Sequence, residues 1–283
     1  MGKEENVKIF QDTKYLCEKN ERLRKQVEWS TENQKLILET DEVPKADLKK
    51  YMAESKVVVS KKRTFEAASN YKGQKVCVHN FASATNPGGG VVNGSSAQEE
   101  CLCRCSGLYF SLNDKRMWDG FYGPHRRSKN PVHNDDMIYT PAVTVFKTDN
   151  NNPRLMAEKD WYDVNVITCA APNLRKKPSN SNNSGDGDQA VKVSARELLA
   201  IHEKRLRRIL DVAVREGNEV VILGAFGCGA FCNSPEVVAQ AARNVVKEYL
   251  YAFKAIEFAV YCRPGDELNY RVFERLIKIQ KNN

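Results

Sequence analysis

Apolar and polar positions follow two different patterns along the chain, and the change comes near residue 55. Residues 6–55 hold long mixed stretches with few glycines, such as NVKIFQDTKYLCEKN and STENQKLILET. Such stretches are typical of helices. From residue 56 onward, short β-rich runs alternate with helical patterns; the runs are VVVS, KVCVHNFAS, VNVITCAAP, VVILGAFGCG and IEFAVYC. This alternation predicts a mainly parallel sheet covered by helices, so we expect an α/β domain over residues 56–283 and a helical extension over 1–55 packed on it.

Four segments carry the clearest helical pattern. They are residues 97–110, 194–216, 235–250 and 267–279. Ser234 suits the N-cap of the third segment and Pro235 suits its first turn. Residues 173–189, NLRKKPSNSNNSGDGDQ, have almost nothing to bury, so we expect a mobile loop there.

Composition limits the class of protein. The chain has 283 residues, of which 41% are hydrophobic and 28% charged, enough to bury a full core. No apolar stretch is long enough for a membrane span, and the first ten residues, MGKEENVKIF, are charged where a signal peptide would be apolar. Nine scattered cysteines fit reduced thiols better than a disulfide framework. We expect a cytoplasmic protein, nuclear if the source is eukaryotic, without membrane contact or an obligate protein partner.

The net charge of +8 permits, but does not require, affinity for a polyanion. The basic residues are spread over several clusters, and an ordinary solvated surface explains any one of them. The clusters are Lys49-Lys50, Lys61-Lys62-Arg63, Arg126-Arg127 and Arg205-Arg208.

The first segment with distinctive chemistry is HNFASATNPGGGVVNGSSAQEECLCRCSGLYF, residues 79–110. It follows a predicted strand. Three consecutive glycines, Gly88, Gly89 and Gly90, permit positive φ and close approach of backbone N–H groups to a phosphate or ribose. The loop then leads into Gln98, Glu99 and Glu100 at the start of a predicted helix. Acidic residues at a helix start also complement the helix dipole, so this motif alone does not decide between a structural and a catalytic role.

The second segment is VVILGAFGCGAFCNSPEVVAQAARNVV, residues 220–246. A strand, a glycine-rich turn and a helix N-terminus together favour an anion site. The turn lacks the Lys-Ser/Thr ending of a Walker loop, and the nicotinamide fingerprint is also absent. Phe226 and Phe231 lie among these glycines. Each can be core or a platform for an adenine or ribose face.

Together the two loops resemble the bacterial-type poly(ADP-ribose) glycohydrolases, which are macrodomain relatives. Their signature is a glycine triplet, a short spacer and QEE, present here as Gly88-Gly89-Gly90 and Gln98-Glu99-Glu100. NPGGG, AQEE and GAFGCGAF are similar as well. The resemblance implies a three-layer α/β/α macrodomain-like fold with a mixed, mainly parallel sheet. It also implies hydrolysis of the ribose glycosidic bond in poly(ADP-ribose), or in ADP-ribosylated protein or nucleic acid.

The resemblance further implies roles by position. Glu100 becomes the catalytic acid/base and Glu99 holds the ribose, while the diphosphate positions the water, because neighbouring helix residues cannot face each other as a carboxylate pair. The two glycine loops would cradle the diphosphate. Substrate contacts are then expected from Asn86, Gly88, Gly89, Gly90, Gln98, Gly224, Ala225, Phe226, Gly227, Cys228, Gly229, Ala230 and Phe231. His79 and Asn80 are weaker candidates, and the adenine partner stays unassigned.

No metal or other cofactor is expected. Cys101, Cys103 and Cys105 fall at i, i+2 and i+4 of a helix, which is not a zinc spacing, and neither His125 nor His133 has a matching ligand pattern.

Two alternatives to the hydrolase remain open: a reader that binds ADP-ribose without cleaving it, and a hydrolase of a free ADP-ribose derivative. A reader has no need for adjacent glutamates beside the ribose, which favours an enzyme.

Overall fold

The computed structural model describes residues 2–42, 46–181 and 183–278. Its centre is a seven-stranded sheet in the order β1-β4-β5-β3-β6-β7-β2. The five strands from β5 to β2 are parallel to one another, whereas β4 is antiparallel to both β5 and β1. The expected mixed, mainly parallel sheet is therefore confirmed.

The strands are β1 (Lys35–Ile37), β2 (Lys56–Ser60), β3 (Val76–Phe81), β4 (Met137–Val145), β5 (Tyr162–Cys169), β6 (Val220–Leu223) and β7 (Ala255–Ala259). The α-helices are α1 (Lys3–Lys19), α2 (Glu21–Asn33), α3 (Thr64–Ala68), α4 (Gln98–Cys105), α5 (Leu108–Leu112), α6 (Lys115–Met117), α7 (Gly123–Ser128), α8 (Ala195–Arg215), α9 (Pro235–Val246) and α10 (Leu268–Ile277). A π-helical turn, Trp118–Tyr122, joins α6 to α7.

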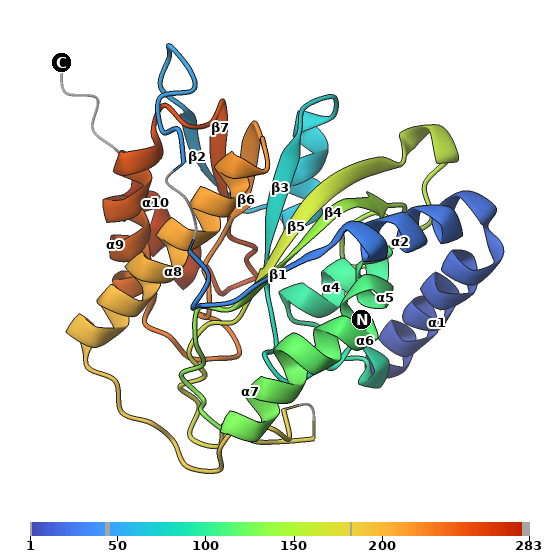
Figure 1. Cartoon of the computed structure of the whole chain (residues 1–283), viewed down its shortest axis with the longest axis horizontal. Coiled ribbons are helices and arrows are strands. Elements are labelled where there is room, and N and C mark those ends of the chain that lie inside the picture. The colour runs from blue at the N-terminus through green and yellow to red at the C-terminus, as the bar shows by residue number, and fades with distance from the viewer. Residues whose placement is uncertain (1, 43–45, 182, 279–283) are drawn as a thin grey trace.

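Helices cover both faces of the sheet, which gives three layers (Figure 1). Helices α8, α9 and α10 pack on one face, and α3, α4 and α5 pack on the other. The alternation along β3 shows how a strand serves both cores, because Val76 and Val78 belong to one cluster while Cys77 belongs to the other. The three-layer α/β/α architecture expected from the resemblance is therefore present.

The N-terminal segment lies outside α4. Helices α1 and α2 form an arm beside α4 and α5 in Figure 1, and Asn6 Nδ2 of α1 donates to Gly94 O at 2.9 Å. The expectation of helix through STENQKLILET is wrong for its second half. Helix α2 ends at Asn33, and Lys35–Ile37 forms β1 at the edge of the sheet.

The predicted helices are close to those observed, with one exception. Residues 97–110 form two helices, because α4 ends at Cys105 and Ser106 adopts an extended backbone, φ −149° and ψ 176°. Ser234 caps α9 through Val237 N at 3.5 Å and Pro235 begins the helix, as expected. Residue 279, the expected end of the last helix, lies outside the described residues.

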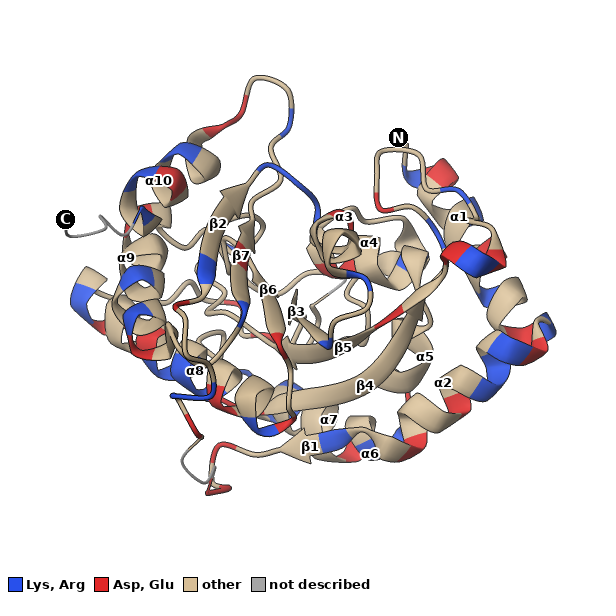
Figure 2. Ribbon diagram, turned by 90° about the horizontal axis from the view of Figure 1, so that it is seen from above, with Lys and Arg blue, Asp and Glu red and all other residues tan. Residues whose placement is uncertain are grey.

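The topology brings the two glycine loops together. Strands β3 and β6 are parallel neighbours, so the loops that follow them, 82–97 and 224–234, leave the same edge of the sheet. Figure 2 shows basic and acidic residues interspersed along the ribbons of α1 and α2. Within the part of the chain that the structure describes, no helix is long and apolar enough to cross a membrane.

Candidate active site

Gln98 fastens the start of α4 to the end of β3. Its Oε1 accepts from Phe81 N at 2.9 Å, and its Nε2 donates to His79 O at 2.7 Å and to Thr64 Oγ1 at 3.0 Å. Both ends of this amide are therefore engaged inside the protein. Gln98 was expected to contact substrate, and the contacts observed here fix the position of the two glutamates that follow it.

Glu99 is held on the same strand end. Its Oε2 accepts from Ser83 N at 2.7 Å and its Oε1 from Asn80 Nδ2 at 3.2 Å, and only 3% of the residue is exposed. Burial, reinforced by the neighbouring charge of Glu100, raises the pKa of Glu99 to about 8. Each oxygen of Glu99 thus accepts one hydrogen bond from the protein.

Glu100 differs from Glu99 in one respect. Its Oε1 accepts from Gly90 N at 2.9 Å, but its Oε2, although buried, has no hydrogen-bond partner among the described residues. Burial also raises the pKa of Glu100. A buried carboxyl oxygen without a partner is costly and marks a place where a proton or a ligand group belongs.

The glycine triplet packs directly on this carboxylate. Gly88 and Gly89 have positive φ values of 66° and 58°. A Cβ atom on Gly89 would lie 2.5 Å from Glu100 Oε1, and one on Gly88 would lie 2.8 Å from Tyr109 Cδ2. The triplet was expected to give a ligand access to the backbone, and the structure adds a second reason for it: the loop must approach Glu100.

The second loop divides into a buried part and an exposed part. Phe226 is buried, with its ring centroid 4.4 Å from that of His79, 5.7 Å from Phe81 and 5.5 Å from His202. It is therefore core, the structural alternative considered from the sequence. Gly229 and Ala230 are exposed at the tip of the loop.

Phe231 is half-buried at the end of that loop. The guanidinium of Arg175 lies 5.6 Å from its ring centroid, and the backbone N–H of Leu174 donates to Phe231 O at 2.9 Å. Phe231 therefore contacts the segment that follows β5, and it retains a partly exposed face.

The weaker candidates His79 and Asn80 are buried, and His79 Nε2 and Asn80 Oδ1 have no hydrogen-bond partner among the described residues. Burial lowers the pKa of His79 to about 3, which keeps the ring neutral against Phe226. Asn80 Nδ2 bridges Glu99 and Thr168 Oγ1, the latter at 3.1 Å. The side chain of Asn80 therefore helps to hold the carboxyl group of Glu99 in place.

Arg126 is a site residue that sequence reasoning did not recognise. Its Nε donates to Thr85 O at 2.7 Å and its Nη2 donates to Asn86 Oδ1. Asn86, the expected ribose contact, is thus held by a guanidinium from α7. The sequence signal was only a basic pair, Arg126-Arg127, which is also typical of an ordinary surface.

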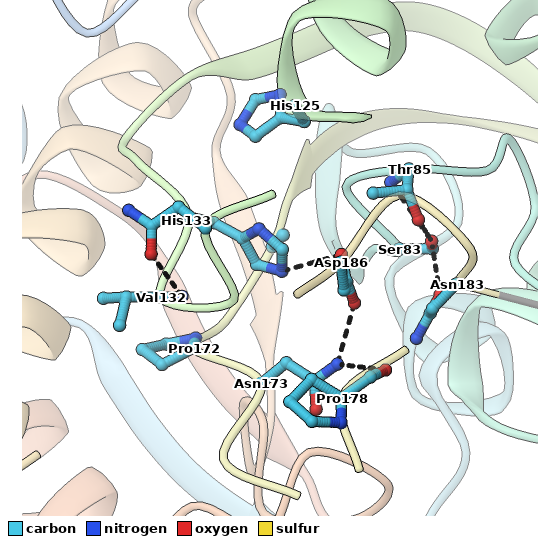
Figure 3. Close-up of polar contacts among 12 residues, drawn as sticks. Ser83, Thr85, His125, Val132, His133, Pro172, Asn173, Pro178, Asn183 and Asp186 are labelled. Atoms are coloured by element: carbon cyan, nitrogen blue, oxygen red, sulfur yellow. Dashed lines mark hydrogen bonds and ion pairs between the residues drawn. The ribbon is translucent and has the colours of Figure 1, made fainter. Parts of the chain in front are cut away.

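The segment after β5 is anchored by buried polar side chains (Figure 3). Asn173 Nδ2 donates to Asp186 Oδ2 at 2.8 Å, and His133 Nε2 lies 3.9 Å from Asp186 Oδ1. All three side chains are buried. The expectation that residues 173–189 have almost nothing to bury is therefore wrong, because polar groups that bond to each other can be buried without an apolar core.

This segment also reaches the loop that carries the predicted substrate contacts. Ser83 Oγ donates to Asn183 Oδ1 at 3.0 Å (Figure 3), and the backbone N–H of the same serine donates to Glu99. A Cβ atom on Gly185 would overlap Arg126 Cγ, so the segment also packs on Arg126. The segment therefore lies two hydrogen bonds from the glutamate pair.

The three cysteines of α4 have separate surroundings. Cys103 and Cys105 are fully buried, whereas Cys101 Sγ accepts from Arg63 Nη1 and Arg104 Nη2, both at 3.3 Å. Two guanidiniums beside one thiol disfavour a cation at that position. Among residues 2–42, 46–181 and 183–278, no group of three or more His, Cys, Asp or Glu side chains could hold a metal ion.

Comparison with known families identifies this arrangement. The family model described as "Microbial-type PARG, catalytic domain" matches residues 3–148, the part that carries the glycine triplet and both glutamates. The chain belongs to this family. PARG stands for poly(ADP-ribose) glycohydrolase in the descriptions of the related structures. A comparison with curated proteins gave no match.

Solved PARG structures share the whole architecture. The enzyme from Thermomonospora curvata is 26% identical, covers 96% of this chain and 98% of its own, and superposes with a TM-score of 0.82. A second T. curvata structure, bound to the inhibitor ADP-HPD, is 27% identical with a TM-score of 0.79 over 95% and 98% of the two chains. The PARG of Deinococcus radiodurans, in complex with ADP-ribose, is 30% identical with a TM-score of 0.73 over 89% and 96%.

Proposed function

We propose that this chain hydrolyses the ribose glycosidic bonds of poly(ADP-ribose), releases ADP-ribose, and uses Glu100 as the acid/base. Family membership supports the reaction, and similar chains are PARG enzymes, one of them in complex with ADP-ribose. The observation that carries the assignment of Glu100 is its Oε2, which is buried and has no hydrogen-bond partner among the described residues.

The raised pKa of Glu100 suits the first step. A protonated Glu100 donates its proton to the departing glycosidic oxygen as the bond to the anomeric carbon breaks, and the ribose takes on oxocarbenium character. The carboxylate that results then accepts a proton from the attacking water, so the carboxyl group is restored and one ADP-ribose unit leaves. Every proton that Glu100 gives is returned within the cycle.

Glu99 is assigned a positioning role beside Glu100. Its two oxygens accept from Ser83 and Asn80, and its carboxyl group lies at the start of the helix that carries Glu100. We assign Glu99 to holding the ribose beside the scissile bond. The strand-end contacts of Glu99 make its position rigid, as such positioning requires.

The diphosphate of the substrate is assigned to the edge where the two loops meet. The first loop supplies Gly88–Gly90 and the second supplies the exposed tip at Gly229 and Ala230. Both loops follow parallel neighbouring strands and both lead to helix N-termini, which favour anions. Asn86, held by Arg126, is assigned to the ribose.

The same loops would serve free polymer, ADP-ribose carried by a macromolecule, a reader, or a hydrolase of free ADP-ribose derivatives. An assay panel separates these functions: purified poly(ADP-ribose), mono-ADP-ribosylated protein, mono-ADP-ribosylated DNA, and ADP-ribose esters, each monitored for release of ADP-ribose. We expect the polymer to be the best substrate. Binding of ADP-ribose without release from any of these substrates would instead identify a reader.

A further inference from the structure

Arg126 of α7 is a half-buried cation whose side chain is held in one position. Its Nε and Nη2 donate to Thr85 O and Asn86 Oδ1, the former at 2.7 Å. The ring centroid of Trp118 lies 4.8 Å from its guanidinium carbon, and Gly185 packs against the aliphatic part of the side chain. The guanidinium group is therefore in place before a ligand binds, which lowers the entropic cost of binding one.

The third nitrogen of this guanidinium group is available to a ligand. Nη1 has no hydrogen-bond partner among the described residues, and it is not among the buried polar atoms that lack one, so it reaches solvent. In the part of the chain that the structure describes, no ion pair joins Arg126 to a carboxylate. Asp186, which follows Gly185, is buried and faces Asn173 and His133 instead. A fixed guanidinium with a free N–H group and no counter-ion suits an anion.

Asn86 connects Arg126 to the glycine triplet. Its side chain accepts from Arg126, and its backbone O accepts from Gly89 N at 3.0 Å. Gly90 N in turn donates to Glu100 Oε1 at 2.9 Å. The guanidinium group therefore borders the turn that approaches the proposed acid/base, on the loop that is assigned to the substrate diphosphate.

We propose that Arg126 binds a phosphate group of the substrate, with Nη1 donating a charge-assisted hydrogen bond to a phosphate oxygen beside the glycine triplet. The inference rests on the proposed hydrolysis of poly(ADP-ribose), a polymer that carries a diphosphate in every unit. It adds a side-chain cation to a site whose other phosphate contacts are assigned to the glycine loops. The phosphate belongs either to the ADP-ribose unit that is released or to the neighbouring unit of the polymer, and two ligands distinguish these sources.

Arg126→Gln removes the charge and keeps an amide donor for Asn86 Oδ1. We expect the affinity for the phosphate-bearing ligand to fall by about tenfold or more, the usual effect of losing a hydrogen bond between charged groups. ADP-ribose is measured by calorimetry, and poly(ADP-ribose) by equilibrium binding in a Glu100→Gln background, in which the polymer should persist. Loss of affinity for both ligands assigns the phosphate to the released unit, whereas loss for the polymer alone assigns it to the neighbouring unit.

Arg127→Gln is the matched control for net charge. Arg127 is the next residue of the same helix, is exposed, and makes no hydrogen bond or ion pair among the described residues, so both affinities should remain close to those of the wild type. Arg126→Lys keeps the charge without the planar fork and should bind more tightly than Arg126→Gln. If thermal melts show that Arg126→Gln does not fold, Arg126→Met replaces it, because methionine keeps the aliphatic packing against Gly185.

The salt dependence of ligand binding separates a phosphate contact from an effect through Asn86. Each phosphate contact that is lost makes the affinity less sensitive to salt concentration. Arg126→Gln should therefore show a shallower salt dependence than the wild type. Asn86→Ala removes the amide but keeps the guanidinium group, so it should keep the wild-type salt dependence even if its affinity falls.

Three results would overturn the proposal. If Arg126→Gln and Arg127→Gln weaken binding equally, net charge is the cause. If Arg126→Gln weakens binding but keeps the wild-type salt dependence, or if it leaves both affinities unchanged, Arg126 only holds Asn86 in place. None of these results bears on the hydrolase assignment, which fails only if the wild type releases no ADP-ribose from any substrate.

Discussion

Gly89 and Glu100 are in direct contact across the turn that leads into α4. A Cβ atom at Gly89 would lie 2.5 Å from Glu100 Oε1 and 3.2 Å from Glu99 Oε2, closer than the van der Waals distance. The next residue, Gly90, donates its backbone N–H to the same Oε1 at 2.9 Å. The triplet therefore packs against the carboxyl group that is proposed as the acid/base.

This contact predicts the effect of Gly89→Ala. The added methyl group must displace the Glu100 carboxylate, and φ of 58° costs alanine about 1–2 kcal/mol of stability. We expect kcat to fall by much more than the affinity for ADP-ribose. Gly73→Ala is the matched control, since Gly73 also has positive φ, 88°, but a Cβ there meets nothing within 4 Å. Equal activities of the two variants would contradict the contact argument.

Glu100→Gln tests the proton transfer itself. The amide keeps the shape and can still accept from Gly90, but it cannot give and regain a proton. We expect turnover of poly(ADP-ribose) to fall by about 100-fold or more, with binding of ADP-ribose measured by calorimetry nearly unchanged. The exposed Glu28→Gln serves as the control. Near-normal turnover of Glu100→Gln would remove Glu100 from the mechanism.

Glu99→Gln tests whether the buried carboxyl group of Glu99 is protonated in the fold, through the pH dependence of the free energy of unfolding. The pKa of Glu99 is raised in the fold from 4.5 to about 8, so the native state holds a proton that the unfolded chain releases. The free energy of unfolding of the wild type should therefore fall as pH rises from about 4.5 to about 8. Denaturant titrations across this range should show a smaller fall in Glu99→Gln. Parallel curves would mean that Glu99 is not protonated in the fold.

Substitutions at Gly227 and Gly229 distinguish effects on folding from effects on ligand binding in the second loop. Gly227 has φ of 77°, and a Cβ there would lie 2.6 Å from Ala171 Cβ, so Gly227→Val should destabilise the free protein. A Cβ on Gly229 meets nothing within 4 Å, so Gly229→Val should melt like the wild type. It should nevertheless lose the stabilisation by ADP-ribose, about 2.7 kcal/mol for the wild type at 100 times Kd. A normal ligand-induced rise in its melting temperature would place the diphosphate elsewhere.

Removal of metal ions should leave the activity unchanged. The thiol of Cys101 lies between two guanidiniums, and Cys103 and Cys105 are enclosed, so α4 offers no place for a cation beside the glutamates. Turnover measured after exhaustive EDTA treatment should equal that before it. A loss that only zinc or magnesium restores would require a metal in the mechanism.

Much of the fold and part of the site could be predicted from the sequence because their signals are local. The β-rich runs between helical stretches predict the parallel part of the sheet, and the Ser234-Pro235 cap predicts the start of α9. Gly88–Gly90 and Gln98–Glu100 lie close together in the chain, so their resemblance to a known family could be read directly. Strand β4 was missed because Pro141 and a register shift between Thr140 and Val143 interrupt its pattern.

The tertiary structure alone decided how the site residues are partnered. Adjacent glutamates are equivalent in the sequence, but Ser83 and Asn80 each donate to one oxygen of Glu99, whereas Glu100 keeps a buried oxygen that has no partner among the described residues. Arg126 reaches Asn86 across 40 positions of the chain. Contacts of this kind depend on which segments the sheet brings side by side, so no local pattern of residues predicts them.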